Sequence, residues 1–416
     1  MEPAYNIDTN EHLPKPQWEV ADILHLYIDD YRQRYPLPAS HEKVVRDIMA
    51  CRTDALGGHV EECDCCGARQ NAYNSCRNRH CPKCQTSSKL RWLEARKAEL
   101  LPVGYFHNVF TLPHLLNPIV LCNKKRMFDL LFHSTAHTLH EFGENKKNGL
   151  EGKLGFIAVL HTWNQRLMDH FHLHVLVPAG ALASDPNRWA PSHPGFLFPV
   201  MALSKVFRGK FIEALQQDFD KGRLRFPGNT SSLENPAVFS DLIGQLWKSP
   251  WVVFSKKPFA GPEQVLDYLG RYTHRVAISN TRIRNVENGA VSFTYRDRRD
   301  GNKSKRMTLE ASEFIRRFLL HVLPENFMRI RHYGFLANRS KKHNLRILRQ
   351  LFDLPPHPVI IPETSIRELF LRLADIDVAR CPFCRKGTMR PVPFENQPTP
   401  VSSNVASVPA PRLDSS

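Results

Sequence analysis

The chain has 416 residues, of which 42% are hydrophobic, so it is long enough for two or three domains with substantial cores. Its formal net charge is +16, and residues 271–349 hold 19 Lys and Arg against 6 Asp and Glu. No stretch approaches the roughly 18 consecutive apolar residues that span a bilayer, and the first residues lack the pattern of a secretory signal. We therefore expect a soluble, intracellular protein with no membrane partner. The local positive charge favours a nucleic acid as partner over an anionic membrane surface.

The first predicted elements are helical and lie in residues 18–50, where apolar residues recur at helical spacing. Seven of the ten cysteines follow in residues 51–84. In a reducing compartment, clustered cysteines bind metal more often than they form disulfides. Residues 1–95 are therefore predicted to form a small helical zinc-binding domain.

Two Cys-x2-Cys pairs in this cluster are separated by 14 residues. Each pair can present two thiolates, and two pairs complete the closed tetrahedral site that structural Zn²⁺ prefers, although a redox pair is an alternative. The predicted zinc ligands are Cys63, Cys66, Cys81 and Cys84. Cys76 and His80 are candidate ligands of a second zinc ion. Another pair, Cys381 and Cys384, would take distant ligands or pair across a dimer.

Strand and helix patterns alternate along residues 96–335, which we predict to be the second domain. The predicted strands are 105–112, 155–163, 170–180 and 251–258. The predicted helices are 121–143, 203–222 and one that opens near Pro262. Asn288 and Gly289 predict a hairpin turn. These patterns favour an α+β fold with a largely antiparallel sheet and helices on one face.

The end of the chain divides into two predicted segments. Residues 336–386 form a basic C-terminal segment that carries the last cysteine pair. Residues 387–416 are rich in Pro and Ser, which predicts a disordered tail.

Three histidines occupy alternate positions in the predicted strand 170–180. Side chains alternate between the two faces of a strand, so His170, His172 and His174 share one face and the apolar residues share the other. One face then belongs to the core, and the other is a row of potential metal ligands. A solvated histidine-rich face is the alternative.

Tyr268 and Tyr272 lie four residues apart and share a face if the segment is helical. The same spacing occurs in the N-terminal helix, where we interpret the tyrosines at 27, 31 and 35 as packing residues. The later pair differs because Arg271 and Arg275 flank it. A divalent ion held by imidazoles can polarise a phosphodiester, and a phenol can be the nucleophile that attacks it. The arginines would stabilise the phenolate.

These residues resemble a known family. His172-Leu173-His174 matches the His-hydrophobic-His motif of HUH endonucleases, and YLGRYTHR at 268–275 is similar to the two-tyrosine motif of their rolling-circle transposases. The cysteine cluster and residues 99–114 resemble the zinc-binding domain, and the segment after it, of bacterial insertion-sequence transposases.

The resemblance implies a ferredoxin-like antiparallel catalytic sheet with both histidines on a central strand and the tyrosines on a facing helix. It implies cleavage and rejoining of single-stranded DNA at the ends of the protein's own insertion sequence, through a 5′-phosphotyrosine, in the bacterial cytoplasm at the nucleoid. His172 and His174 would bind Mg²⁺ or Mn²⁺, and Tyr268 and Tyr272 would be the nucleophiles. The candidates for the third metal ligand are His161 first, then His170 and Gln165.

Cations and aromatic residues are mixed in the basic segment 271–349. Aromatic platforms in a positive groove hold unpaired bases, although strand core is the alternative for each ring. The candidate stacking residues are Phe293, Tyr295, Tyr333 and Phe335. The cations predicted to contact DNA are Arg271, Arg275, Arg298, Arg299, Lys341 and Lys342.

Two other functions compete with DNA strand transfer. One is a non-catalytic zinc-finger protein that binds nucleic acid, such as a degenerate transposase. The other is a zinc hydrolase, which is disfavoured because the sequence has no His-Glu-x-x-His motif.

Overall fold

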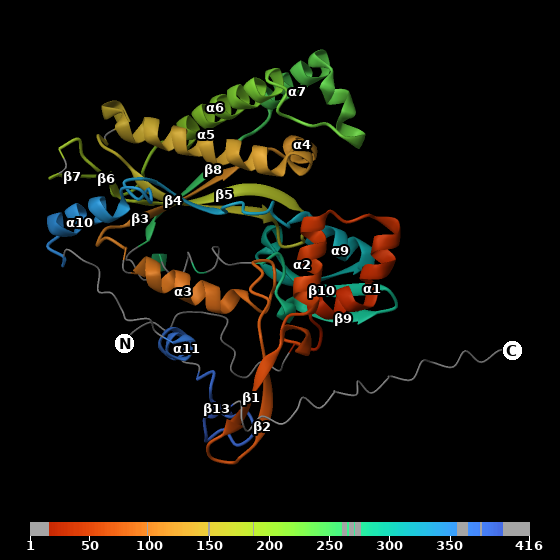
Figure 1. Cartoon of the computed structure of the whole chain (residues 1–416). Coiled ribbons are helices and arrows are strands. Elements are labelled where there is room, and N and C mark those ends of the chain that lie inside the picture. Colours follow the sequence, from red (N-terminus) through yellow and green to blue (C-terminus); the bar gives the residue numbers. More distant parts are fainter. Residues whose placement is uncertain are drawn as a thin grey trace.

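The computed structural model describes residues 16–97, 99–148, 150–185, 187–259, 264–265, 270, 276–355, 365–374 and 377–393. Over these ranges the chain combines antiparallel sheets with helices, which confirms the predicted α+β class (Figure 1). The two predicted nucleophiles and the arginines that flank them, at 268, 271, 272 and 275, lie outside the described residues.

A five-stranded antiparallel sheet forms the centre of the molecule. Its strands are, in spatial order, β12 (Ile330–Gly334), β4 (Gly155–Trp163), β5 (Asp169–Pro178), β3 (Tyr105–Thr111) and β8 (Val252–Phe259). Helices follow β3 and β5 in the chain, so β3, β4, β5 and β8 have the β-α-β-β-α-β order of a ferredoxin-like fold. The sheet therefore has the implied topology, with β12 added beside β4.

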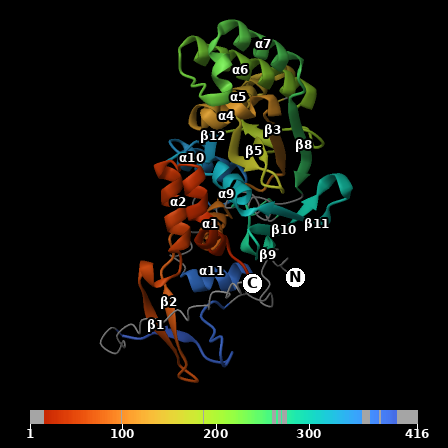
Figure 2. The same ribbon diagram turned by 90° about the vertical axis from the view of Figure 1, so that its right-hand side faces the viewer.

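Helices cover one face of this sheet (Figures 1 and 2). They are α4 (Asn117–Cys122), α5 (Lys124–Glu144), α6 (Val200–Asp220) and α7 (Pro236–Lys248). Phe171, Leu173 and Val175 of β5 are at most 1% exposed and share a core with Phe128 of α5 and Phe207 of α6. The apolar half of the alternation in β5 therefore faces the helices, as predicted.

The opposite face of the sheet is also partly covered, so the prediction of helices on one face only is wrong. Val159 of β4 packs in a cluster with Leu348 of α10 (Lys341–Leu351). Leu176 of β5 packs with Leu93 of α3 (Gln85–Lys97). These apolar side chains point away from α5 and α6 and therefore need cover of their own.

A second core joins the N-terminal helices to a smaller sheet. Helices α1 (Val20–Arg34), α2 (Ala39–Met49) and α9 (Ala311–Leu320) pack with β9 (Ile283–Glu287), β10 (Ala290–Asp297) and β11 (Lys303–Glu310). Asn288 and Gly289 have φ values of 48° and 73° in the β9–β10 turn, which confirms the predicted hairpin. Tyr31 is 6% exposed in this core and Tyr27 packs against it, as expected of packing residues. Tyr35 is 50% exposed, so its interpretation as a packing residue is wrong.

A hairpin of β1 (Gly58–Cys63) and β2 (Arg69–Tyr73) extends away from α1 and α2 (Figure 2). The short strand β13 (Met389–Pro391) pairs with β1, so the prediction of disorder from residue 387 is wrong for residues 387–393. The Pro- and Ser-rich composition of the following residues concealed this strand. Residues 394–416 lie outside the described part of the chain.

The remaining elements are β6 (Gly180–Leu182), β7 (Trp189–Pro191) and α11 (Ile366–Ala374). None of the helices in the described ranges has the length and apolar character required to cross a membrane.

Substituting Leu173→Ala should lower the free energy of unfolding by about 2–5 kcal/mol, because the side chain is fully buried under the helical layer. Leu115→Ala is the matched control, since Leu115 is 41% exposed, and it should change stability by less than about 0.5 kcal/mol. Urea denaturation of both variants measures the difference. Equal effects would contradict the assignment of this face of β5 to the core.

Candidate metal centres

Three histidines from two neighbouring strands meet on the face of the sheet that points away from α5 and α6. His161 of β4 pairs directly with His172 of β5, and His174 lies two residues further along β5. Potential ligand nitrogens of the three lie within 4.8 Å of one another. The side chains are buried, with exposures of 5, 7 and 9%. Three imidazoles therefore converge on one enclosed point.

Hydrogen bonds orient the central pair of imidazoles. Nδ1 of His172 lies 2.8 Å from the carbonyl oxygen of His170 and donates its proton to that oxygen. Nε2 of His172 then presents a lone pair 3.1 Å from Nε2 of His174. Two ligands about 2.1 Å from an octahedral ion lie about 3.0 Å apart when they are neighbours. The pair therefore has the spacing of two ligands on one divalent ion.

His107 of β3 forms a hydrogen bond with His174 and was not among the predicted site residues. Its Nε2 lies 2.9 Å from Nδ1 of His174. Burial, with a smaller effect of Lys256, lowers the pKa of His107 to about 3, so His107 is neutral and can accept the Nδ1 proton of His174. This leaves Nε2 of His174 for an ion, as outer hydrogen bonds do at metal sites. Period-two alternation in β3 could have indicated His107, because Tyr105 and Val109 share its face.

The other two candidates for the third ligand do not join the group. The ring of His170 lies 4.6 Å from that of His172 and 5.7 Å from that of His114, between centroids. Gln165 lies in the turn after β4, where its backbone carbonyl oxygen accepts a hydrogen bond from the Arg282 side chain. The structure therefore brings His161, rather than either alternative, to the central pair.

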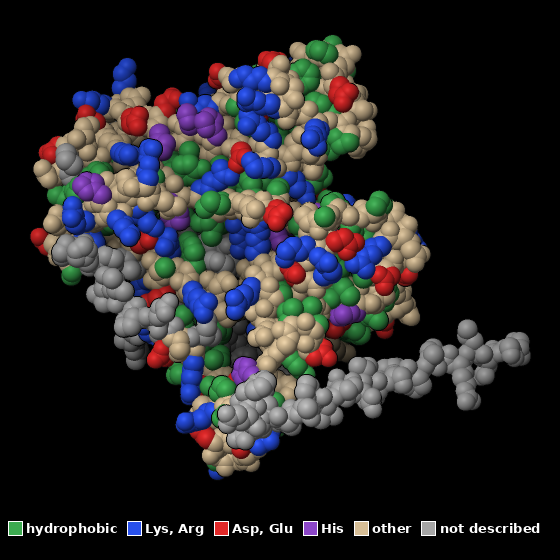
Figure 3. All heavy atoms as spheres, in the orientation of Figure 1, with side chains coloured by type: hydrophobic (Ala, Val, Ile, Leu, Met, Phe, Trp, Pro, Cys, Tyr) green, Lys and Arg blue, Asp and Glu red, His purple; other side chains and the backbone are tan. Residues whose placement is uncertain are grey.

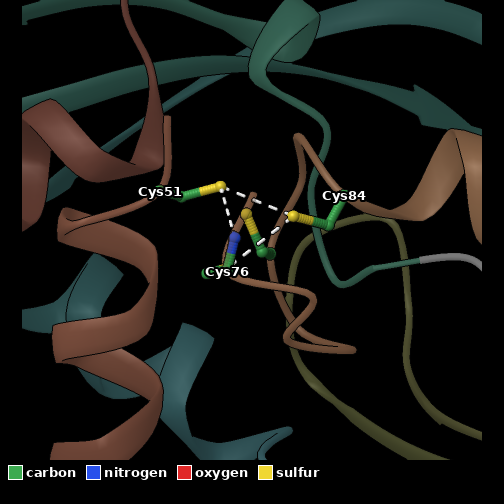
Figure 4. Close-up of side chains that lie close together, drawn as sticks. Cys51, Cys76 and Cys84 are labelled. Atoms are coloured by element: carbon green, nitrogen blue, oxygen red, sulfur yellow. Dashed lines mark hydrogen bonds between the residues drawn. The ribbon is translucent and has the colours of Figure 1, made fainter. Parts of the chain in front are cut away.

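The N-terminal cysteines form a compact group of four thiols, contributed by Cys51, Cys76, Cys81 and Cys84. Sγ of Cys84 lies 3.4 Å from Sγ of Cys51 and 3.6 Å from Sγ of Cys76 (Figure 4). Thiolates around a tetrahedral zinc with bonds of about 2.3 Å are about 3.8 Å apart. Hydrogen bonds from the neighbouring thiols, Cys51 first, lower the pKa of Cys84 and favour the thiolate that binds metal.

The predicted grouping of the two N-terminal Cys-x2-Cys pairs is therefore wrong. Cys63 is the last residue of β1 and Cys66 follows it, and both belong to a separate group with Cys381 and Cys384. The β1–β2 hairpin separates the two cysteine pairs, because one lies at its far end and the other at its base. The spacing of the cysteines along the chain does not reveal this separation. The last cysteine pair thus finds its partner within the same chain.

Cys76 and His80 do not form a pair of metal ligands as predicted. Cys76 belongs to the first group of thiols, whereas His80 lies outside it. Nε2 of His80 accepts a hydrogen bond from the Leu323 amide at 3.4 Å. Burial lowers the pKa of His80 to about 3, so it is a neutral packing residue between the N-terminal module and the main body.

The cations predicted to contact DNA have different surroundings. Lys341 is 15% exposed and donates to Glu99 at 2.6 Å, so its charge is neutralised within the protein. Lys342 and Arg299 are exposed, and Arg298 begins the short 3-10 helix Arg298–Asp300. On the side of the molecule that Figure 3 shows, Lys and Arg are spread among Asp and Glu rather than gathered in one patch.

Two of the four predicted stacking residues are core residues. Phe293 and Phe335 are fully buried, so neither ring can stack on a base. Tyr333 stacks on Phe156 with ring centroids 5.0 Å apart. Tyr295 is half-buried on β10 and stays a candidate. The alternative reading of these rings as strand core therefore holds for Phe293 and Phe335.

Comparison with known proteins matches both parts of the chain. The family model described as "Transposase zinc-binding domain" matches residues 23–112, and the one described as "Putative transposase" matches residues 155–344. "Putative transposase y4qJ" of Sinorhizobium fredii (strain NBRC 101917 / NGR234) is 48% identical over 375 residues, which are 89% of this chain and 94% of that protein. "Transposase for insertion sequence element IS801" of Pseudomonas savastanoi pv. phaseolicola is 28% identical over 350 residues, 82% of this chain and 81% of that protein. No solved structure matches the chain.

The cysteine-rich module and the histidine-bearing sheet thus define a transposase with an N-terminal zinc-binding domain. The chain belongs to the family of rolling-circle transposases of bacterial insertion sequences.

Replacing His107 by Ala should weaken the binding of Mn²⁺ by about 10–100-fold, because His174 loses the partner that orients it. His107→Gln is the matched control, since its amide oxygen can still accept the Nδ1 proton, and it should retain most of the affinity. Isothermal titration of both variants measures the change. Affinity of wild-type strength in His107→Ala would show that His107 does not support an ion site.

Proposed function

We propose that this transposase cleaves and rejoins single-stranded DNA at the ends of its insertion sequence, with Tyr268 and Tyr272 as nucleophiles. The observation that carries the proposal is the convergence of His161, His172 and His174 on one buried point of the sheet. These imidazoles are proposed to hold Mg²⁺ or Mn²⁺. Nitrogen ligands suit Mn²⁺ better than Mg²⁺.

The residues described on either side of Tyr268 support the proposed role of the tyrosines. Val265 is fully buried in a cluster with Leu176, which lies two residues after His174 and on the same face of the sheet. A Cβ added to Gly270 would lie 3.0 Å from the side chain of Leu93, so this backbone approaches α3. Both contacts are on the side of the sheet that carries the histidines.

In the proposed reaction, the phenolate oxygen of one tyrosine attacks the scissile phosphorus. The bond from phosphorus to the 3′ oxygen breaks, which yields a 5′-phosphotyrosine and a 3′-hydroxyl after that oxygen takes up a proton. Attack by a 3′-hydroxyl on the phosphotyrosine reverses the chemistry and rejoins DNA. A bound divalent ion supplies charge stabilisation for the phosphate oxygens. The ligands are neutral imidazoles, so they leave the positive charge of the ion uncancelled.

We also propose that Cys51, Cys76, Cys81 and Cys84 hold a structural Zn²⁺ in the matched zinc-binding domain. Cys51 follows α2 and Cys84 precedes α3, so the ion would connect these two helices at the base of the hairpin. Four protein ligands make a closed site, which is the pattern of structural rather than catalytic zinc.

Incubation with Mn²⁺ and labelled single-stranded DNA from the ends of the element should give an adduct that survives denaturation. The Tyr268→Phe/Tyr272→Phe double variant should give none. His172→Ala/His174→Ala should slow adduct formation by about 100-fold or more, which corresponds to about 3 kcal/mol of lost charge stabilisation. Adduct formation is measured by denaturing gel electrophoresis.

Tyr31→Phe is the matched control, because Tyr31 has the same four-residue spacing to a second tyrosine but is buried in the second core. It should form the adduct as the wild type does. DNA binding without any adduct in the wild type would favour the non-catalytic alternative. An adduct in the double variant would reject these tyrosines as nucleophiles.

A further inference from the structure

We propose that Cys63, Cys66, Cys381 and Cys384 form a second zinc site, which fastens the C-terminal segment to the far end of the β1–β2 hairpin. The matched zinc-binding domain ends at residue 112, so half of this ligand set lies outside it. The proposal concerns metal binding and local order, and it does not depend on the DNA chemistry proposed above.

The sulfur positions fit a single zinc ion. Sγ of Cys63 lies 3.7 Å from Sγ of Cys384, and Sγ of Cys66 lies 3.8 Å from Sγ of Cys381. Thiolates bound to one tetrahedral zinc are separated by about 3.8 Å when the bonds are about 2.3 Å. Each of the two short distances joins a sulfur from the N-terminal pair to one from the C-terminal pair, 321 and 315 residues apart in the chain.

The backbone around the thiols has the form of two facing zinc knuckles. The amides of Cys65 and Cys66 donate to Sγ of Cys63 at 3.4 and 3.5 Å. In the other knuckle, the amides of Lys386 and Gly387 donate to Sγ of Cys384 at 3.5 and 3.4 Å. Amide donors of this kind stabilise the negative charge of metal-bound thiolates. One sulfur of each knuckle, Cys63 and Cys384, therefore accepts hydrogen bonds of the kind that metal-bound thiolates accept.

Gly387 allows the two knuckles to approach each other. A Cβ at this position would lie 2.6 Å from Cβ of Cys65 and 2.9 Å from Oδ1 of Asp64. The next amide, of Thr388, donates to the same Asp64 oxygen at 2.8 Å. The C-terminal backbone thus passes directly over the N-terminal pair, and a side chain at residue 387 would separate them.

Apolar packing around these knuckles is too small to hold them together. The cluster of buried residues here contains Cys63, Cys381 and Met389, with Cys384 packed against it. Strand β13 adds only three residues beside β1. A core of this size does not stabilise a small module without disulfides or a metal. Zinc binding would supply the missing stabilisation, since it is coupled to folding at such sites.

The fastened segment also contacts the side of the molecule that carries the histidines. Leu369 of α11 packs with Leu90 of α3, and Arg372 pairs with Glu94 at 3.1 Å. Helix α3 packs in turn against Leu176 through Leu93. We call residues 365–374 and 377–393 the strap. Its helix α11 packs along α3, next to the face of the sheet with the three imidazoles, and its other end carries the second zinc site.

The full-length protein should contain about two zinc ions per chain, and the Cys381→Ser/Cys384→Ser variant about one. In that variant, the amides of α11 should exchange with solvent at least about tenfold faster, while those of β3, β4 and β5 should not change. Inductively coupled plasma mass spectrometry measures the zinc content, and hydrogen exchange measures the order of the strap.

Cys65→Ser is the matched control, because Cys65 lies within the same knuckle but outside the group of four thiols, and it should keep about two ions. Gly387→Ala retains every thiol and should release one ion at a lower chelator concentration than the wild type. Unchanged zinc content in the Cys381→Ser/Cys384→Ser variant overturns the site. Unchanged amide exchange of α11 in the Cys381→Ser/Cys384→Ser variant overturns the proposal that the site fastens the C-terminal segment.

Discussion

The register between β4 and β5 is the constraint on which the candidate catalytic centre depends. Phe171, Leu173 and Val175 are buried under α5 and α6, and a shift of one residue would turn them all to the opposite face. The apolar side of β5 therefore fixes His172 opposite His161 without help from an ion. Because the imidazoles are already oriented by this packing and by their hydrogen bonds, an ion would bind with little rearrangement.

Much of this sheet could be predicted from the sequence, because its strands alternate with a period of two. The predicted strand 155–163 coincides with β4, and 170–180 overlaps β5. The same periodicity separated core residues from ligand candidates in β5. Alternation in β3 assigns His107 to a face of the strand, but it does not say which strand is the neighbour. Only the pairing of β3 with β5 brings His107 to His174. The arrangement of the tyrosines stays a prediction, because they lie outside the described residues.

The cysteine groups could be predicted in type but not in composition. A Cys-x2-Cys motif identifies two ligands of one ion, yet it does not say which second pair completes the set. Cys51 belongs to no such motif, and Cys381 is 315 residues from Cys66. The hairpin explains both groupings, because one thiol group lies at its base and the other at its far end. Strand β2 has no buried residue, so the hairpin depends on its two ends rather than on a core of its own.

The pairing of β13 with β1 also affects the order of events during synthesis. Cys63 leaves the ribosome 321 residues before Cys384, so all strands of the central sheet are synthesised while the edge of β1 still lacks its last neighbour. Any copy of the gene interrupted before the codons for residues 381–391 leaves that edge open in the finished polypeptide. Unpaired strand edges promote association between chains. Proteins made from truncated copies of the insertion sequence would therefore be prone to aggregation.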